Sequence, residues 1–233
     1  MTKVFTKPDK PRLFFKHMMR EMFKLGFTSI PIVAIISLFI GAVIALQMAL
    51  NFDSPLLPKI YIGLATREVL LLEFSSTVIA LILAGKVGSN IASEIGSMRI
   101  TEQIDAMEIM GLNSANYLIL PKVVALVIFN PFLTALSSIL GIIGGGLLVD
   151  ITQVIRIVDY INGIQFVFNE FYVFYGIIKM AVFSIIITTI PAFYGYYASG
   201  GSLGVGQSST RSIVASSVFI LVFDLILTQL LLQ

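Results

Sequence analysis

This sequence of 233 residues contains no cysteine, one histidine and few charged residues. The absence of cysteine excludes disulfide bonds, thiol catalysis and metal sites with cysteine ligands. The single histidine, His17, has no partner histidine or carboxylate cluster, so we interpret it as a surface residue. Charged residues make up 12% of the chain and hydrophobic residues 57%, whereas soluble domains carry about 25% charged residues. One soluble core cannot hide so much apolar surface, and we expect lipid to cover the rest.

Five apolar segments are long enough to cross a hydrocarbon core of about 30 Å, which takes roughly 20 helical residues. They run over residues 27–50, 61–91, 117–149, 171–198 and 212–232. A strand barrel would need many short alternating segments, so helices are the sensible interpretation. The first segment is also too long for the apolar part of a cleavable signal peptide. The sequence therefore predicts an all-α integral membrane protein, with residues 1–233 as one domain.

The distribution of basic residues predicts the orientation of these spans. Seven of the fifteen lysines and arginines lie within the first 24 residues. If the N-terminus is cytoplasmic, that side receives eleven basic residues and the outer side four. Because basic residues favour the cytoplasmic side, we expect a cytoplasmic N-terminus and, after five spans, a C-terminus outside the cytoplasm.

Residues 11–26 have the pattern of an amphipathic helix lying at the membrane surface. Pro11 is well placed to begin a helix. A basic stripe at four-residue steps consists of Arg12, Lys16, Arg20 and Lys24, and the roughly opposite face carries Phe14, Phe15, Met18, Met22 and Leu25. The alternative is that these charges only fix the topology. We favour the interfacial helix, because topology alone does not require an apolar face.

Residues 97–110 predict a short acidic helix on the cytoplasmic side, between the second and third spans. Ile100, Ile104 and Met107 share one face, and three acidic residues lie off it, namely Glu102, Asp105 and Glu108. Residues 94–108 hold four acids and one base. An apolar ridge flanked by acids suits a groove with basic edges on a partner protein. The alternative is a connecting helix on the membrane surface, but such a helix is normally basic, since the inner leaflet is anionic.

Glu73 lies inside the second predicted span, where a carboxylate at mid-bilayer costs roughly 2.5–3.5 kcal/mol even by the lower estimates. Such a residue faces an interior or a cavity. Two interpretations stay open: Glu73 contacts a substrate headgroup, or it forms a polar lock between helices, with Lys179 as a partner. The sequence alone does not choose between them.

The segment 201–208 imitates a nucleotide-binding loop. It reads GSLGVGQS, which matches the phosphate-binding pattern except that Gln207 stands where the lysine belongs. The preceding residues are a membrane span rather than the strand that the motif needs. We therefore expect a tight cytoplasmic turn here, no bound nucleotide, and no cofactor or metal ion elsewhere in the chain.

Two segments of the chain resemble the MlaE-type permease family. They are AGKVGSNIASEIGSMRITEQIDAMEIMG at 84–111 and GYYASGGSLGVGQSSTRSIVASSVFILVFDLILTQLLL at 195–232. The family consists of membrane subunits of ABC transporters that move phospholipid between the inner and outer membranes of Gram-negative bacteria. The buried acid of the family corresponds to Glu73, although members often carry Arg-Glu-x-Gly-Pro where this chain has Leu72-Glu73-Phe74-Ser75-Ser76.

The resemblance implies a non-enzymatic permease that acts as a homodimer in the bacterial inner membrane. It implies a cytoplasmic ABC ATPase docked on the acidic helix, a periplasmic MCE-domain protein, and no nucleic-acid partner. Phospholipid would occupy a cavity between protomers, and the expected contacts are Glu73, Leu38, Val43 and Leu46. Three alternatives stay open: a permease for a sterol or hopanoid, a membrane-embedded lipid-modifying enzyme, and a scaffold. A single histidine and no cysteine argue against the enzyme.

Overall fold

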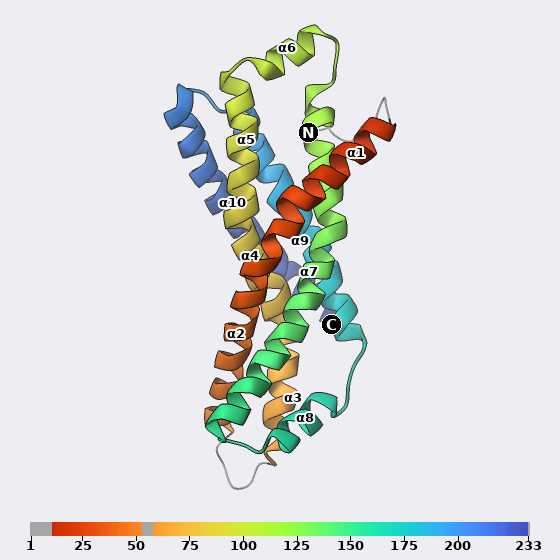
Figure 1. The fold of residues 1–233 in the computed structure, drawn as a ribbon, viewed down its shortest axis with the longest axis vertical. Helices are drawn as coiled ribbons and strands as arrows, with labels where there is room; N and C mark the ends of the chain where they lie inside the picture. Colours follow the sequence, from red (N-terminus) through yellow and green to blue (C-terminus); the bar gives the residue numbers. More distant parts are fainter. Residues whose placement is uncertain (1–10, 53–57, 233) are drawn as a thin grey trace. The chain divides into compact units, whose positions relative to one another are not determined.

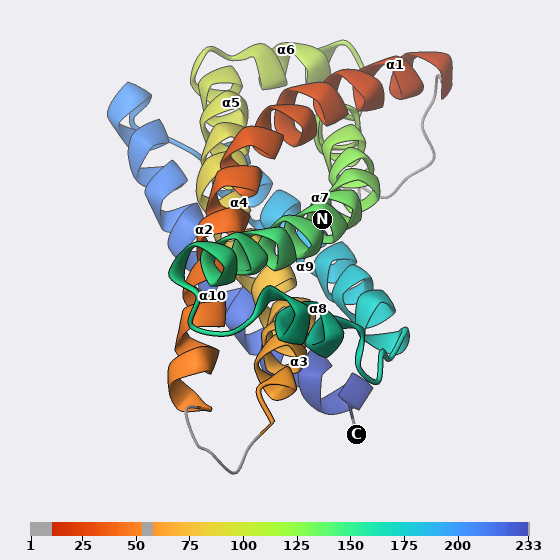
Figure 2. The same cartoon turned by 60° about the horizontal axis from the view of Figure 1, so that its bottom comes forward.

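The computed structural model describes residues 11–52 and 58–232, and within these residues the chain is helical and contains no strand. Five continuous helical stretches have the length and composition to cross a membrane. They are Pro11–Asn51, Ile60–Ile100, Ser114–Thr152, Phe171–Tyr196 and Gly201–Leu232. The predicted all-α membrane architecture is therefore confirmed. Figures 1 and 2 show the course of the chain from two directions.

The first two stretches are built from several helical segments. The first contains α1 (Pro11–Glu21) and α2 (Ile30–Asn51), joined by one wide π-helical turn and one tight turn over residues 22–29. The second contains α3 (Ile60–Val69), α4 (Ile79–Leu83) and α5 (Ser89–Ile100), with π-helical stretches at Leu70–Val78 and Ala84–Gly88 between them. Such wide turns in membrane helices frequently mark functional positions.

The remaining helices are α6 (Gln103–Ile109), α7 (Ser114–Thr152), α8 (Ile157–Gln165), α9 (Phe171–Tyr196) and α10 (Gly201–Leu232). The chain divides into two compact units. Unit 1 comprises residues 1–29, 80–130 and 180–233, and unit 2 comprises residues 30–79 and 131–179. Each unit is therefore assembled from segments that are distant in the sequence.

Unit 2 is held together by close contact between helix backbones. A Cβ atom added to Gly41 of α2 would lie 1.9 Å from the carbonyl oxygen of Gly141 in α7. A Cβ atom added to Gly163 of α8 would lie 2.2 Å from the carbonyl oxygen of Ile60, which begins α3. Small residues allow the helix backbones to approach this closely. The resulting dispersion contacts stabilise the packing, because in lipid there is no hydrophobic effect to drive helices together. The side-by-side course of α3 and α8 is visible in Figures 1 and 2.

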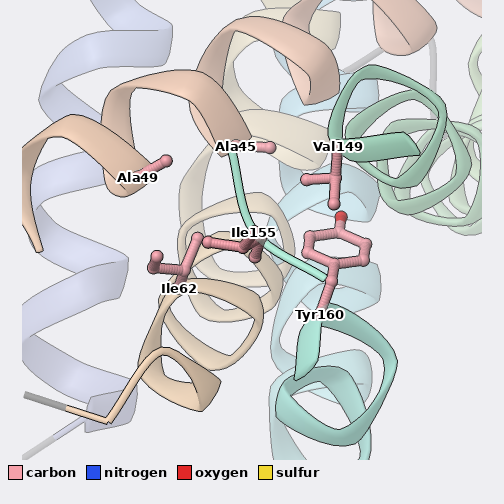
Figure 3. Packing of buried hydrophobic residues seen from close by; sticks show 6 residues of the cluster. All are labelled: Ala45, Ala49, Ile62, Val149, Ile155 and Tyr160. Carbon is pink, nitrogen blue, oxygen red and sulfur yellow. The ribbon is translucent and has the colours of Figure 1, made fainter. Parts of the chain in front are cut away.

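Unit 2 contains a hydrophobic cluster of buried side chains (Figure 3). Its members come from α2, α3, α7 and the chain around α8, and they are Ala45, Ala49, Ile62, Val149, Ile155 and Tyr160. The hydroxyl group of Tyr160 donates to the carbonyl oxygen of Ile142 at 3.0 Å. Burial raises the pKa of this phenol above its ordinary value. Tyr160 therefore acts as a neutral hydrogen-bond donor that fastens α8 to α7.

Unit 1 packs α10 and α9 against α5, again through small residues. A Cβ atom added to Gly96 of α5 would lie 3.1 Å from the side chain of Val205 in α10. One added to Gly195 of α9 would lie 2.6 Å from the carbonyl oxygen of Ala92 in α5. Figures 1 and 2 show α10 beside α5. This packing supports the end of α5, from which the segment leading to α6 departs.

Candidate functional site

The segment predicted as one acidic helix over 97–110 is two helices in the structure. The first is the end of α5, and the second is α6. Between them Glu102 has a left-handed backbone with φ 59°, and the hydroxyl group of Thr101 donates back to the carbonyl oxygen of Ser97 at 2.8 Å. The chain therefore changes direction at Glu102 (Figure 1). Sequence periodicity does not reveal this break, because a left-handed glutamate is uncommon.

The apolar ridge predicted for partner binding faces largely inward. Ile104 is completely buried, and Ile100 and Met107 are half-buried. The burial of Ile104 argues against its insertion into a groove on another protein, and docking of a partner on this segment stays a prediction. The exposed apolar side chains are instead Ile109 and Met110, which are 87% and 68% exposed. They lie at the end of α6, where the periodic pattern of the ridge does not extend.

Two of the three predicted acids hold α6 in place. Asp105 forms an ion pair with Arg99 at the end of α5. Glu108 accepts hydrogen bonds from the hydroxyl groups of Tyr196 at 2.7 Å and Ser114 at 3.0 Å. Since Tyr196 ends α9 and Ser114 begins α7, α6 is tied to three other helices. The third acid, Glu102, is exposed, and within the described residues it forms no ion pair or side-chain hydrogen bond of this kind.

A buried lysine ties α1 to the same unit. Lys122 of α7 is 3% exposed and donates to Glu21 at 2.7 Å and to Glu94 of α5 at 2.9 Å. Lys24 pairs with the same Glu94 carboxylate at 3.1 Å. From the sequence, Lys122 contributed only to the predicted orientation of the spans, and this network of ion pairs was not predicted. A lysine close to the start of an apolar span was the available signal, because a buried cation requires a partner.

The amphipathic pattern of residues 11–26 is retained, with a different division of its faces. Met18 and Leu25 are buried, whereas the basic side chains of Arg12, Lys16 and Arg20 are exposed. A second exposed row at four-residue steps is apolar, and it consists of Phe15, Met19, Phe23 and Phe27. Placement of α1 at the membrane surface remains a prediction.

Glu73 lies in the π-helical stretch Leu70–Val78 and forms an ion pair with Lys179 of α9 at 3.1 Å. The ammonium group of Lys179 is completely buried and also donates to the hydroxyl group of Tyr175 at 3.1 Å. The hydroxyl group of Thr77 donates to the Glu73 carboxylate at 3.3 Å. The lock that the sequence left open is thus present. The Glu73 side chain is still 41% exposed, so a ligand can reach the carboxylate.

The three predicted acyl-chain contacts lie on α2. Val43 and Leu46 are exposed, and Leu38 is half-buried with its backbone against Gly144 of α7. The same helix exposes further apolar side chains, namely Ile32, Ile35, Phe39 and Leu50. Val43 and Leu46 therefore belong to a broad apolar surface, and exposure does not single them out.

The glycine-rich segment 201–208 is helical rather than a turn, so that prediction is wrong. It forms the start of α10. The chain reverses just before it, where Gly200 and Gly201 have φ values of 89° and 69°. Glycine adopts this conformation without strain, so these two residues suffice for the turn and the later glycines continue the helix. A regular helix offers none of the cradling backbone of a phosphate-binding loop.

These features define a class of protein: a multi-pass, all-helical membrane protein with a charged helix fixed outside its spans. Residues 18–230 match the family model described as Permease MlaE. The chain therefore belongs to the MlaE permease family, and the resemblance drawn from the sequence is confirmed.

Three relatives illustrate this membership. The chain is 35% identical to a probable ABC transporter permease protein of Rickettsia bellii, over 95% of this chain and 85% of the relative. It is 32% identical to a probable ABC transporter permease protein of Synechocystis, over 99% of this chain and 87% of the relative. It is 31% identical to the intermembrane phospholipid transport system permease protein MlaE of Haemophilus influenzae, over 94% of this chain and 84% of the relative.

Proposed function

We propose that this chain is the membrane subunit of an ABC-type transporter that moves phospholipid between the inner and outer membranes. A separate cytoplasmic ATPase drives it, and the permease itself catalyses no reaction. Membership of the MlaE family supports this proposal, as do the names of the relatives from Rickettsia and Haemophilus.

The observation that carries the proposal is the attachment of α6. Glu108 is bonded to the ends of two long helices, α7 and α9, and Asp105 is paired with the end of α5. A force applied to α6 is therefore passed to three spans at once. Ile109 and Met110 offer the partner an exposed apolar contact, and Glu102 adds a negative charge at the opposite end of α6. We place the ATPase contact on these three residues instead of on Ile104.

The transport cycle follows from this attachment. ATP binding closes the ATPase pair and displaces α6, which moves the ends of α5, α7 and α9. The spans then repack at their small-residue contacts. A phospholipid held between two protomers is expelled toward, or accepted from, a periplasmic MCE-domain protein.

The lipid contacts proposed on this chain are Glu73 and the exposed side of α2, including Leu38, Val43 and Leu46. The Glu73 carboxylate is within reach of a headgroup because its side chain is partly exposed, while Lys179 holds it in place from the buried side. Apolar side chains of α2 suit acyl chains. The N-terminus is cytoplasmic and the C-terminus periplasmic, as the distribution of basic residues favours.

The first test is purification of the tagged chain from its native membrane, with mass spectrometry of bound proteins and lipids. We expect an ABC ATPase, an MCE-domain protein and phospholipid. A sterol or hopanoid in place of phospholipid would change the substrate, and a complex that binds lipid and chemically alters it would favour an enzyme. A chain that purifies without an ATPase would contradict the proposal and favour a scaffold.

The second test addresses the ATPase contact. Ile109→Asp and Met110→Asp should reduce the amount of co-purified ATPase, because each places a charge in an apolar contact. The matched control is Ile151→Asp, since Ile151 is 80% exposed at the other end of α7. Equal ATPase recovery from all three variants would show that α6 is not the docking element.

A further inference from the structure

Unit 2 contains a cavity of about 520 Å³ that the proposed transport function does not use. Its walls come from α3 and the stretch after it, the second half of α7, α8, and the start of α9. Most of the lining side chains are aliphatic or aromatic, for example Leu71, Ala135, Ile139, Ile142, Phe168 and Ile177. Pockets that bind small molecules have volumes of roughly 300–1,000 Å³ and are lined mainly by apolar side chains. The cavity therefore has the size and chemistry of a binding site.

One cation lies in this apolar wall. Arg67 of α3 lines the cavity and is 1% exposed. Its terminal nitrogens donate to three carbonyl oxygens, that of Ile164 at the end of α8 and those of Phe166 and Val167 just after it. The Glu68 carboxylate lies 3.6 Å away and is partly exposed. The guanidinium group is thus held by three neutral carbonyl dipoles and by a longer ion pair with Glu68.

The Nε–H group of Arg67 has no hydrogen-bond partner in the described part of the chain. A buried donor without an acceptor is costly and rare in folded proteins, so it calls for an explanation. The backbone beside it is also strained, because Val167 has φ 45° and β-branched residues seldom adopt that region. Strain that persists against its cost is concentrated at ligand sites. Both observations point to a ligand that supplies an acceptor.

We propose that this cavity binds one acyl chain of an anionic single-chain amphiphile, with the acidic group accepting from Arg67. The apolar walls take the hydrocarbon chain, and a carboxylate or phosphate oxygen satisfies the free donor in a charge-assisted hydrogen bond. Arginine suits such groups because its planar donors match their oxygens. Glu73 and Lys179 do not line the cavity, so the site is separate from the transport contacts proposed above.

The chain contains no tryptophan, so a single introduced tryptophan reports on the cavity without background. Tyr172→Trp places the reporter in the cavity wall, and Phe174→Trp places it two residues away on an exposed position of the same helix. Each purified variant is titrated with a brominated fatty acid, whose bromine quenches nearby tryptophan, and with the corresponding brominated fatty alcohol. We expect saturable quenching at position 172 only. The acid should bind at least about tenfold more tightly than the alcohol, as expected for a charged hydrogen bond.

Two further variants locate the interaction, both in the Tyr172→Trp background. Arg67→Gln should weaken binding of the acid to that of the alcohol, and Ala135→Phe should abolish saturable quenching by filling the cavity. Arg67 supports the surrounding backbone, so a thermal melt checks that its variant is folded. If the Arg67→Gln variant is unfolded, the comparison of acid with alcohol on the protein that retains Arg67 still tests whether the acidic group contributes to binding.

Brominated lysophospholipids identify the source of the acidic group. Preference for an anionic over a zwitterionic lysophospholipid, with weak binding of the fatty acid, assigns the site to a lipid; the opposite assigns it to free fatty acids. Equal binding of acid and alcohol would overturn the role of Arg67. Unsaturable quenching at both tryptophan positions would overturn the site itself. These titrations need neither ATPase nor transport, so their failure leaves the proposed function standing.

Discussion

Glu73→Gln should destabilise the protein more than Lys179→Met, although the two variants break the same ion pair. The reason is an asymmetry of burial: the Lys179 ammonium is completely buried, whereas Glu73 is 41% exposed. Without Glu73, the ammonium keeps neutral acceptors, such as the carbonyl oxygen of Leu72 at 3.3 Å and the Tyr175 hydroxyl at 3.1 Å. Without Lys179, the partly exposed carboxylate keeps its hydrogen bond from the hydroxyl group of Thr77 at 3.3 Å.

The expected magnitudes follow from this difference. Removing one partner of a buried pair costs about 3–5 kcal/mol of unfolding free energy, because a buried charge is left uncompensated. Glutamine still accepts a hydrogen bond, so we expect the lower end, about 3 kcal/mol for Glu73→Gln. A carboxylate that is partly exposed and keeps a hydroxyl donor should cost less than the fully buried ammonium, about 1–2 kcal/mol. The double variant should be more stable than Glu73→Gln alone, since Lys179→Met removes the buried charge.

Thermal unfolding of the purified variants measures these differences. For a chain of this size, about 3 kcal/mol corresponds to a fall in Tm of roughly 6–12 °C. Arg156→Met serves as a control, because the pair between Arg156 and Asp159 is on the surface and should contribute little. Equal falls for Glu73→Gln and Lys179→Met, or a double variant less stable than both, would refute the reasoning from burial.

Three further predictions concern packing and attachment. Gly41→Ala should prevent folding or lower the Tm strongly, because the added Cβ would meet the backbone of Gly141. Gly85→Ala should be neutral or stabilising by about 0.5–1 kcal/mol, because its Cβ meets nothing within 4 Å. Similar thermal stability of the two variants would contradict the packing argument. Lys122→Met should leave two carboxylates without their shared cation and increase hydrogen exchange in residues 11–29, whereas the exposed Lys16→Met should not; unchanged exchange would show that the network does not hold α1. Tyr160→Phe should cost about 1 kcal/mol of unfolding free energy at neutral pH. Because the pKa of Tyr160 is raised in the folded state, the free energy of unfolding should fall above about pH 10, where the phenol ionises in the unfolded chain. This part of the fall should be smaller in Tyr160→Phe, and chemical unfolding at several pH values measures it.

The apolar runs were sufficient to predict five spans because lipid imposes a length and a helical backbone on each of them. The ends of these helices were less predictable. The fifth begins at Gly201 rather than near residue 212, since a glycine followed by polar small residues is compatible with both turn and helix. Helix α8 was missed altogether, although Ile157, Tyr160 and Ile164 have helical spacing.

The family motif at 84–111 indicated the segment on which we propose the ATPase contact, but not the residues that a partner would touch. Helical periodicity treats residues 97–110 as one cylinder, so it placed Ile104 on an outer ridge. The reversal at Glu102 rotates α6 relative to α5 and turns Ile104 inward. The left-handed residue thus divides residues 97–110 into two helices, and a periodic pattern taken over the whole segment does not detect such a break.

The sequence by itself determined that the chain is a helical membrane protein, and it located the spans, because lipid requires long apolar helices. It also contained the two segments that resemble a permease family. Only the tertiary structure decided which charges meet. Lys179 finds Glu73 across 106 positions, and Lys122 finds Glu21 across 101. Such pairing depends on how helices from distant parts of the chain pack, and composition and periodicity describe each helix only along its own axis. The same holds for the cavity beside Arg67, whose four walls adjoin one another only after folding.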